Sequence, residues 1–205
     1  MRIFISGTHG TGKSTLLNQA RAEKENGNPL YKDMEIIGEI ARHVSPLLPL
    51  NDNATDLSIE LLANLHLANA ARYENLIQDR SIIDVLVYAL VQKKRRPDSI
   101  SNDIIDFVWD RVLFTINSGW MDGILLVRKS FPLEGDAVRP ADVDFQRQVE
   151  REFSSVMDRI LSSFPVVTIW TNAYPHLRKY GISYVTAPPT IEHLTSTIKA
   201  TEARV

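Results

Sequence analysis

The sequence predicts an α/β fold in three layers, with helices on both faces of a central, mainly parallel sheet of five strands. Three observations lead to this prediction. Short apolar runs alternate with helical segments of about 10–20 residues, a pattern typical of parallel sheets. The first apolar run leads directly into a glycine-rich loop and then into a helix. No repeat period or low-complexity tract appears, so solenoids and linkers are not expected.

The first half of the chain supplies three of the strands. Apolar runs at residues 2–6 and 34–37 predict the first two. Between them, residues 13–25 have helical composition, and an Asn-Gly-Asn-Pro sequence then stops the helix. Apolar residues recur at helical spacing over residues 55–72 and predict a second helix. The very short apolar pair Leu76-Ile77 predicts the third strand.

The second half continues the alternation. Helices are expected at residues 82–92, 102–117, 142–163 and 191–202, and strands at residues 123–127 and 166–170. Ser101 and Thr190 are the expected N-caps of two of these helices. Residues 128–141 are rich in proline, glycine and charge, which predicts a loop, and we expect a lid over residues 128–147.

Composition narrows the classes of function. The 205 residues are 44% hydrophobic and 23% charged, so one domain over residues 1–205 can bury a core. The formal charge of −2 argues against a uniformly basic binder of nucleic acids. The absence of cysteine excludes disulfides, thiolate zinc sites and a cysteine nucleophile. No apolar run is long enough to span a membrane, and a motif at Gly7 leaves no room for a signal peptide, so a cytoplasmic location is expected.

The most specific motif is the run Gly7-Thr8-His9-Gly10-Thr11-Gly12-Lys13-Ser14. It fills every fixed position of the pattern G-x-x-x-x-G-K-[ST], the Walker A motif, between a predicted strand and a predicted helix. Glycines let the backbone N–H groups wrap around an oligophosphate, and the helix N-terminus adds positive potential. The run therefore predicts a loop that binds a nucleoside triphosphate.

Individual residues of this motif have separate expected roles. Lys13 is expected to face solvent and to bridge the β- and γ-phosphates of ATP, and Ser14 to offer its hydroxyl to Mg²⁺. Thr15 is close enough along the helix to contact the α-phosphate. His9 stands at a variable position, so we interpret it as a loop residue near the phosphates rather than a catalytic group.

Three further elements accompany this loop. Asp79-Arg80-Ser81-Ile82-Ile83-Asp84 follows the third strand, and Glu39-Ile40-Ala41-Arg42 follows the second. The segment 128–151 carries Arg128, Arg139, Arg147 and Arg151. A carboxylate that leaves a strand beside a phosphate loop suits a hard cation that keeps several waters, so Asp79 is a candidate Mg²⁺ ligand. The alternative is an ordinary helix start, with Asp79 or Ser81 as its N-cap and Asp84 as an acidic residue of the first turn.

These four elements together resemble the P-loop kinases of nucleosides and nucleotides, including deoxynucleoside and thymidylate kinases. The sequence looks most similar to the AAA-labelled group of small ATPases and kinases that includes the ribosylnicotinamide kinase domain. The resemblance covers residues 1–150 and implies a P-loop NTPase three-layer sandwich with a lid. It also implies ATP as the donor and Mg²⁺ as the metal.

The resemblance further implies roles for the residues outside the loop. Asp79 would hold Mg²⁺, and Arg80 would reach substrate or phosphate. Glu39 would lie near the acceptor hydroxyl, with Arg42 and Asp84 binding the acceptor. In the lid, Arg128 and Arg139 would neutralise the transferring phosphoryl group, because guanidinium groups stay charged and bind phosphate oxygens bidentately.

Several features of the sequence depart from the pattern of this family, and others are less informative about function. The sequence has no clear pyrimidine or purine signature, and the lid is unlike the short arginine-rich lid of thymidylate kinases. By resemblance, the turn at Thr186-Ala187-Pro188 would approach the adenine. His43, His66, His176 and His193 show no metal-binding spacing. We interpret Phe107 and Trp109 as core residues, and the basic run 93–96 as a solvated helix end.

The sequence therefore predicts an ATP- and Mg²⁺-dependent phosphotransferase. Its acceptor would be a nucleoside, a (deoxy)nucleoside monophosphate or a related small hydroxyl compound. Three alternatives stay open: a kinase of DNA, acting on a hydroxymethyl base or a polynucleotide end; a regulatory ATPase without an acceptor; and a kinase of small metabolites of the shikimate or gluconate type. The expected partner is a small molecule rather than a membrane, and a homodimer is left open.

Overall fold

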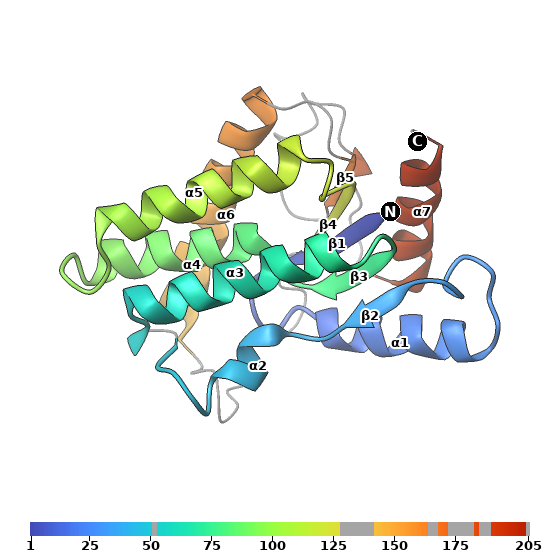
Figure 1. The fold of residues 1–205 in the computed structure, drawn as a ribbon, viewed down its shortest axis with the longest axis horizontal. Helices are drawn as coiled ribbons and strands as arrows, with labels where there is room; N and C mark the ends of the chain where they lie inside the picture. The colour runs from blue at the N-terminus through green and yellow to red at the C-terminus, as the bar shows by residue number, and fades with distance from the viewer. Residues whose placement is uncertain (51–52, 128–141, 164–167, 172–182, 185–189, 204–205) are drawn as a thin grey trace.

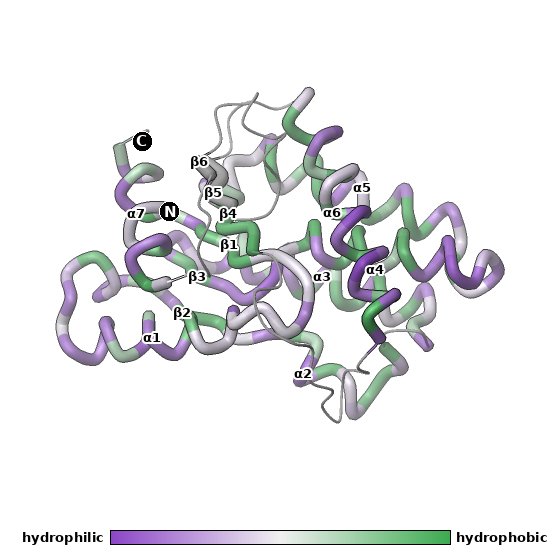
Figure 2. Tube along the Cα trace, turned by 180° about the vertical axis from the view of Figure 1, so that it is seen from behind, coloured by the Kyte–Doolittle hydropathy of each residue, from purple (hydrophilic) through white to green (hydrophobic). Residues whose placement is uncertain are grey.

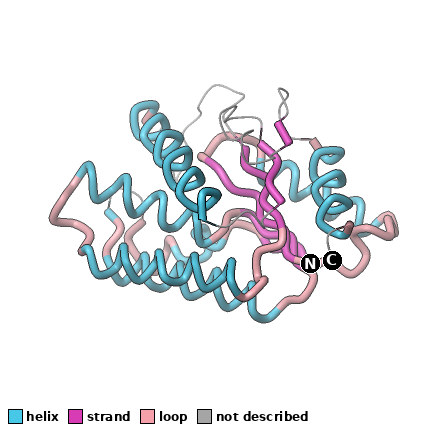
Figure 3. The backbone as a smooth tube through the Cα atoms, turned by 90° about the horizontal axis from the view of Figure 1, so that it is seen from above, coloured by secondary structure: helices cyan, strands magenta, loops and turns pink. Residues whose placement is uncertain are grey.

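The computed structural model describes residues 1–50, 53–127, 142–163, 168–171, 183–184 and 190–203. Helices lie on both faces of a parallel sheet (Figures 1 and 3). In chain order the elements are β1 (Arg2–Gly7), α1 (Lys13–Glu25), β2 (Glu35–Ile37), α2 (Ile40–Val44), α3 (Asp56–Arg72), β3 (Leu76–Asp79), α4 (Ile82–Arg95), α5 (Asn102–Asn117), β4 (Gly123–Val127), α6 (Val143–Ser163), β5 (Thr168–Thr171), β6 (Ser183–Tyr184) and α7 (Ile191–Glu202). The predicted α/β class is confirmed.

The sheet of the described residues has six strands in the order β2-β3-β1-β4-β5-β6, all paired in parallel. The prediction of five strands is wrong by one. The additional strand, β6, has two residues, and so short a segment carries no periodicity that a sequence pattern can reveal. The central position of β1 places the loop that follows it at the middle of the carboxyl edge of the sheet.

Two apolar cores form because alternate residues of each central strand point to opposite faces. On β1, Phe4 packs with the core on the side of α3, α4, α5 and α6, whereas Ile3 and Ile5 pack with α1 and α7. On β4, Leu126 belongs to the first core and Leu125 to the second. Figure 2 shows β4 in the green of hydrophobic residues, whereas the helices alternate between green and purple. Strands buried on both faces are typical of parallel sheets.

Helix boundaries agree closely with the sequence pattern where capping residues exist. The Ser101 side chain accepts a hydrogen bond from the Ile104 N–H, and Thr55 and Thr190 are the N-caps of α3 and α7. Helix α4 extends three residues beyond the predicted Gln92, because its basic residues are good helix formers. The short α2 was not predicted as a helix.

Three further expectations from the sequence can be compared with the fold. Residues 143–147 of the expected lid form the first turns of α6, and residues 128–141 lie outside the described residues. Among the helices of the described segments, none combines the length and apolarity needed to cross a bilayer. Phe107 and Trp109 pack against the larger core, as predicted for them.

Candidate active site

The loop of residues 7–14 joins the central strand β1 to helix α1. Its three glycines all have positive φ: 132° at Gly7, 68° at Gly10 and 85° at Gly12. Residues that have a side chain rarely adopt a positive φ, so the glycines permit the loop to take this backbone conformation. At Gly7 there is also no space, since a Cβ there would lie 2.0 Å from the Val127 carbonyl oxygen of β4.

Lys13 points back into the 7–14 loop. Its Nζ donates hydrogen bonds to the carbonyl oxygens of Gly7, at 3.0 Å, and Thr8, and to Thr11 Oγ1 at 3.1 Å. The side chain is buried, with 5% of its surface exposed, so the prediction that Lys13 faces solvent is wrong. The loop carbonyls curve around the ammonium because it is the nearest strong donor. The positive charge is consequently held inside the curve of the loop.

Asp79 ends strand β3 next to the start of α1. Its Oδ2 accepts a hydrogen bond from Ser14 Oγ at 3.3 Å. Its Oδ1 is buried, and no group in the described part of the chain donates a hydrogen bond to it. A buried carboxylate oxygen that lacks a donor is costly unless a cation compensates it. Together with the Ser14 hydroxyl it makes a pair of hard oxygen ligands that fits Mg²⁺.

Arg80 connects the loop to the elements around it. Its φ of 69° is the one positive value among the described residues other than glycine, and its N–H donates to Ile5 O at 2.9 Å. The guanidinium donates to Gly7 O at 3.1 Å, to Glu39 Oε1 at 2.7 Å and to Asp84 Oδ1 at 3.2 Å. Burial alone would lower the pKa of Arg80, but Tyr88, Asp84 and Asp79 raise it above its ordinary value, so the group stays charged.

Asp84 has two structural functions. One is in the capping box of α4, whose N-cap is Ser81 as the alternative predicted, since the Asp84 Oδ2 accepts from the Ser81 N–H. The other is a contact with the 7–14 loop, because its Oδ1 accepts from the Gly7 N–H at 3.2 Å. The predicted contact of Asp84 with the acceptor stays a prediction.

Glu39 lies at the carboxyl end of β2, where it precedes α2. Its Oε1 accepts from Arg80 and its Oε2 from Arg42 Nε at 3.2 Å. Glu39 is buried, whereas 43% of the Arg42 side chain is exposed. The structure thus brings Glu39, Arg42, Arg80 and Asp84 together beside the loop, although these residues come from two stretches of sequence about 40 residues apart. Their roles in binding or chemistry stay predictions.

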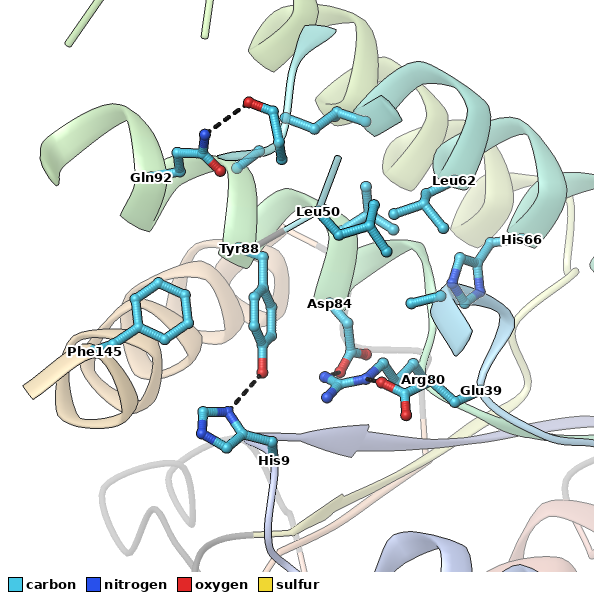
Figure 4. A pocket seen from close by; sticks show the side chains of 15 residues that line it. His9, Glu39, Leu50, Leu62, His66, Arg80, Asp84, Tyr88, Gln92 and Phe145 are labelled. Carbon is cyan, nitrogen blue, oxygen red and sulfur yellow. Dashed lines mark hydrogen bonds and ion pairs between the residues drawn. The ribbon is translucent and has the colours of Figure 1, made fainter. Parts of the chain in front are cut away.

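A pocket opens on the α3, α4 and α6 side of these residues (Figure 4). The cavity has a volume of about 80 Å³, several times the roughly 10–15 Å³ that one buried water needs. Its polar lining residues are His9, Glu39, His66, Arg80, Asp84, Tyr88 and Gln92. The remainder of the wall is apolar or aromatic and includes Leu50, Ile59, Leu62 and Phe145. We call it the acceptor pocket because its lining includes Glu39, Arg80 and Asp84, to which the sequence resemblance assigns the acceptor, and that role stays a prediction.

His9 joins the loop to this pocket. Its ring stacks on Phe145 at 6.3 Å between centroids, and Phe145 meets the edge of Tyr88 at 5.8 Å. Gln146, next to Phe145, donates from Nε2 to the His9 carbonyl oxygen at 2.9 Å. The first turn of α6 therefore contacts both the loop backbone and the acceptor pocket.

The remaining predicted site residues are not part of this cluster. Thr15 follows Ser14 on α1 and is exposed, and its contact with the α-phosphate stays a prediction. Arg147 is exposed and pairs with Asp144 at 3.4 Å, and Arg151 is exposed on the same helix. Arg128, Arg139 and the turn at residues 186–188 lie outside the described residues.

Sequence reasoning missed several residues that line the pocket: Tyr88, Gln92, His66 and Phe145. Each is one residue on a helix whose spacing predicts only that it faces inward. His66 was considered only as a metal ligand, and in the described part of the chain no group of three or more His, Asp or Glu residues is arranged to hold a metal. For Gln92 a signal existed, because an amide on the buried face of an apolar helix needs a partner.

A family model described as an AAA domain matches residues 2–174. The chain belongs to this AAA domain family. The matched part of the AAA domain includes the 7–14 loop, Asp79, Arg80 and all of the acceptor pocket. Among curated proteins, none matches the sequence.

Solved structures resemble the fold of this AAA domain. The NadR protein in complex with NR superposes with a TM-score of 0.57 at 14% identity, covering 82% of this chain and 42% of that chain. A second NadR structure, with NAD and AMP-PNP, gives 0.57 and 14%, covering 98% and 48%. Thymidylate kinase from Candida albicans gives 0.55 at 16% identity, covering 98% and 91%.

At these identities the likeness concerns the fold. The chain spans less than half the length of the two NadR chains it matches. These structures therefore show that the AAA domain shares its fold with NadR and with thymidylate kinase. The kinase activity that the sequence resemblance implied stays a prediction.

Proposed function

We propose that the protein is an ATP- and Mg²⁺-dependent phosphotransferase whose acceptor is a nucleoside, a nucleoside monophosphate or a related small hydroxyl compound. The observation that carries this proposal is the position of Arg80, which contacts the 7–14 loop with one nitrogen and Glu39 of the acceptor pocket with another. A phosphate loop and a second, mostly apolar pocket thus share a wall. A protein that only hydrolyses ATP has no need of this second pocket.

The donor end of the site is argued from the loop. Backbone N–H groups of residues 7–14, the start of α1 and the Lys13 ammonium would bind the triphosphate. Lys13 would exchange its bonds to the loop carbonyls for bonds to phosphate oxygens. Asp79 and Ser14 would hold Mg²⁺, which, when bound, neutralises phosphate charge.

At the acceptor end, Glu39 would orient the acceptor hydroxyl. The hydroxyl oxygen forms a bond to the γ-phosphorus, the bond from that phosphorus to the β–γ bridging oxygen breaks, and ADP leaves. The hydroxyl proton passes to the Glu39 carboxylate or to water. Phosphoryl transfer depends mainly on position and charge, so a carboxylate held by Arg80 and Arg42 suits this role.

The charges of the lining favour a nucleoside over a monophosphate. Among the described lining residues Glu39 and Asp84 are acidic and Arg80 is basic, and the guanidinium already contacts both carboxylates. An acceptor phosphate would therefore enter a pocket with net negative charge and with its cation already engaged. A neutral nucleoside meets no such repulsion, and the apolar and aromatic walls suit a base.

A DNA acceptor is the second candidate, and the basic run at the end of α4 is a stretch whose charge would suit its phosphate backbone. Each of these four cations has a partner within the chain: Lys93 contacts Ile100 O, Lys94 pairs with Glu152, Arg95 with Asp142, and Arg96 contacts Asn53. Charges engaged in this way make a weak footprint for a phosphate backbone, so the small-molecule acceptor is preferred.

The test is release of ADP from ATP and Mg²⁺ in the presence of different acceptors. The panel contains the four deoxynucleosides, the corresponding ribonucleosides, their 5′-monophosphates and DNA with hydroxymethyl bases or free 5′ ends. We expect one nucleoside to raise ADP release at least about tenfold above the rate without acceptor. A monophosphate as the best acceptor would contradict the charge argument. Hydrolysis that no acceptor accelerates would favour the regulatory ATPase.

A further inference from the structure

One buried polar group in the acceptor pocket has no part in the mechanism above. His66 lies on α3, lines the pocket beside Glu39 and Arg80, and exposes only 4% of its surface (Figure 4). A buried histidine without a function is costly unless both ring nitrogens have partners. The partners of its two nitrogens therefore indicate what it does.

The Nδ1 atom is held by Gln78 of strand β3. The two side-chain atoms Gln78 Nε2 and His66 Nδ1 are 2.6 Å apart, and the same Gln78 atom lies 3.1 Å from the main-chain carbonyl oxygen of Arg80. A carbonyl oxygen only accepts, so this atom of Gln78 must be the amide nitrogen. Asn69 Nδ2 donates to Gln78 Oε1 at 3.0 Å, which agrees with that orientation. His66 Nδ1 is consequently an acceptor and carries no proton.

The ring is then neutral with its proton on Nε2. Burial lowers the pKa of His66 to about 4, with Asp84 acting in the opposite direction, so the neutral form dominates at neutral pH. No described residue accepts a hydrogen bond from Nε2. The pocket therefore contains a fixed N–H donor whose opposite edge is clamped to the sheet.

The surroundings of this donor indicate the kind of group that it would meet. Leu62 lies four residues before His66 and shares its helix face, and Ile59 lies one turn further back on α3. An N–H donor beside apolar side chains suits the edge of a flat heterocycle, which has apolar faces and lone pairs in its plane. A ligand that lacks an acceptor atom at this edge leaves the N–H unpaired.

We propose that His66 is a specificity-determining residue of the acceptor pocket, whose Nε2–H donates a hydrogen bond to a carbonyl oxygen or an unprotonated ring nitrogen of the acceptor base. This proposal rests on the proposed function, since it assumes that a nucleoside fills the pocket. It assigns no chemical step to His66. The contact selects among bases by the atom that each presents to α3.

Two variants separate a contact to the ligand from a structural role. In His66→Asn, Oδ1 can replace Nδ1 as the acceptor for Gln78, but the donor toward the pocket is lost. In His66→Gln, Nε2 can replace the donor, but the bond to Gln78 is lost. We expect His66→Asn to raise the KM of the best nucleoside about tenfold, with the KM of ATP unchanged, and His66→Gln to retain more of the nucleoside affinity. The reverse order would mean that His66 acts only through Gln78 and would overturn the proposal.

A complementary test uses nucleoside analogues that each lack a single acceptor atom. Examples are the 1-deaza, 3-deaza or 7-deaza form of a purine and the 2-deoxo or 4-deoxo form of a pyrimidine. For the atom that His66 contacts, the analogue should lose about tenfold in kcat/KM with the wild-type protein and little with His66→Asn. Equal losses in both proteins for every analogue would exclude the contact.

A spectroscopic measurement does not depend on turnover. In ¹⁵N NMR spectra of the full chain, the His66 signals, assigned by their absence from His66→Asn, should show an unprotonated Nδ1 and a protonated Nε2. Addition of the best nucleoside from the panel should shift Nε2 and leave Nδ1 nearly unchanged. Turnover of nucleosides with no shift of Nε2 would overturn the role of His66 and leave the proposed function standing. No turnover and no binding of any nucleoside would overturn both.

Discussion

The 7–14 loop and the acceptor pocket lie side by side but are assembled in different ways. The loop is one uninterrupted run between β1 and α1, and its conformation depends on three glycines within it. The acceptor pocket takes its walls from the loop, α2, α3, α4, α6 and the segment between α2 and α3. A local structure of this kind tolerates little change at its fixed positions, whereas a composite pocket can change the ligand that it binds through one side chain. The predictions below test this difference.

The largest effect is expected from removal of the charge inside the loop. Lys13→Met keeps the apolar stem but removes the donor to phosphate, and we expect kcat to fall by a factor of roughly 10²–10³. The buried position of Lys13 means that a loss of stability must be checked, by thermal unfolding of the same sample. Lys24→Met, at the other end of the same helix, is the control and should keep normal turnover. Wild-type kcat in Lys13→Met would reject the donor site.

A substitution of Gly7, at the strand end of the loop, should also be strongly unfavourable, because the backbone there has no room for a side chain. Gly7→Ala places a Cβ against the Val127 carbonyl oxygen at a φ of 132°, and we expect it to lower the free energy of unfolding by about 3 kcal/mol or more. Gly119→Ala is the matched control, because Gly119 also has positive φ but an added Cβ meets no atom within 4 Å. It should cost roughly 1 kcal/mol from the backbone alone. Urea denaturation compares the two, and equal losses would show that the close approach to Val127 carries no weight.

In the acceptor pocket the corresponding substitution is Glu39→Gln. It keeps the shape but removes the charge that would orient the acceptor hydroxyl, and we expect kcat to fall about 10²-fold with the KM of ATP nearly unchanged. Glu35→Gln, on the exposed side of β2, should leave the kinetics as they are. An unchanged kcat in Glu39→Gln would remove Glu39 from the mechanism, and a large change in the KM of ATP would blur the separation between the two regions.

The smallest effect is on the pH dependence of stability. Because burial lowers the pKa of His66 to about 4 in the folded protein, the unfolded chain takes up the proton first as pH falls below about 6.5. The contribution of neutral His66 to the free energy of unfolding is therefore complete above that pH and is lost as the pH falls toward 4. Between pH 7 and pH 5 the loss is about 2 kcal/mol. Chemical denaturation at several pH values should show that the free energy of unfolding depends less steeply on pH in His66→Asn than in the wild type. His43→Asn, at an exposed position, should keep the wild-type slope.

The contrast between the two regions also explains what the sequence could predict. The boundaries of α1, α5 and β4 follow from glycines, capping residues and apolar runs that lie within or next to each element. The 7–14 loop was predictable for the same reason. Asp79, Glu39 and Arg80 could be placed at the carboxyl edge of the sheet, because each follows a strand, but their ion pairs could not.

The remaining features depend on packing between distant segments. His66 and Phe145 are 79 residues apart in sequence, and the packing of both α3 and α6 against α4 brings them to the same pocket. The inward position of Lys13 was mispredicted because it depends largely on the carbonyl oxygens of Gly7 and Thr8, and main-chain acceptors have no sequence signature. The two-residue strand β6 pairs with β5 in parallel, at a position that no apolar run in the sequence marks.

The first turn of α6 physically links the 7–14 loop to the acceptor pocket. Gln146 donates a hydrogen bond to the loop backbone at His9, and its neighbour Phe145 lines the acceptor pocket. A small rotation of that turn would move both contacts at once. The affinities for ATP and for acceptor are therefore expected to be thermodynamically coupled, each substrate altering the dissociation constant of the other by the same factor.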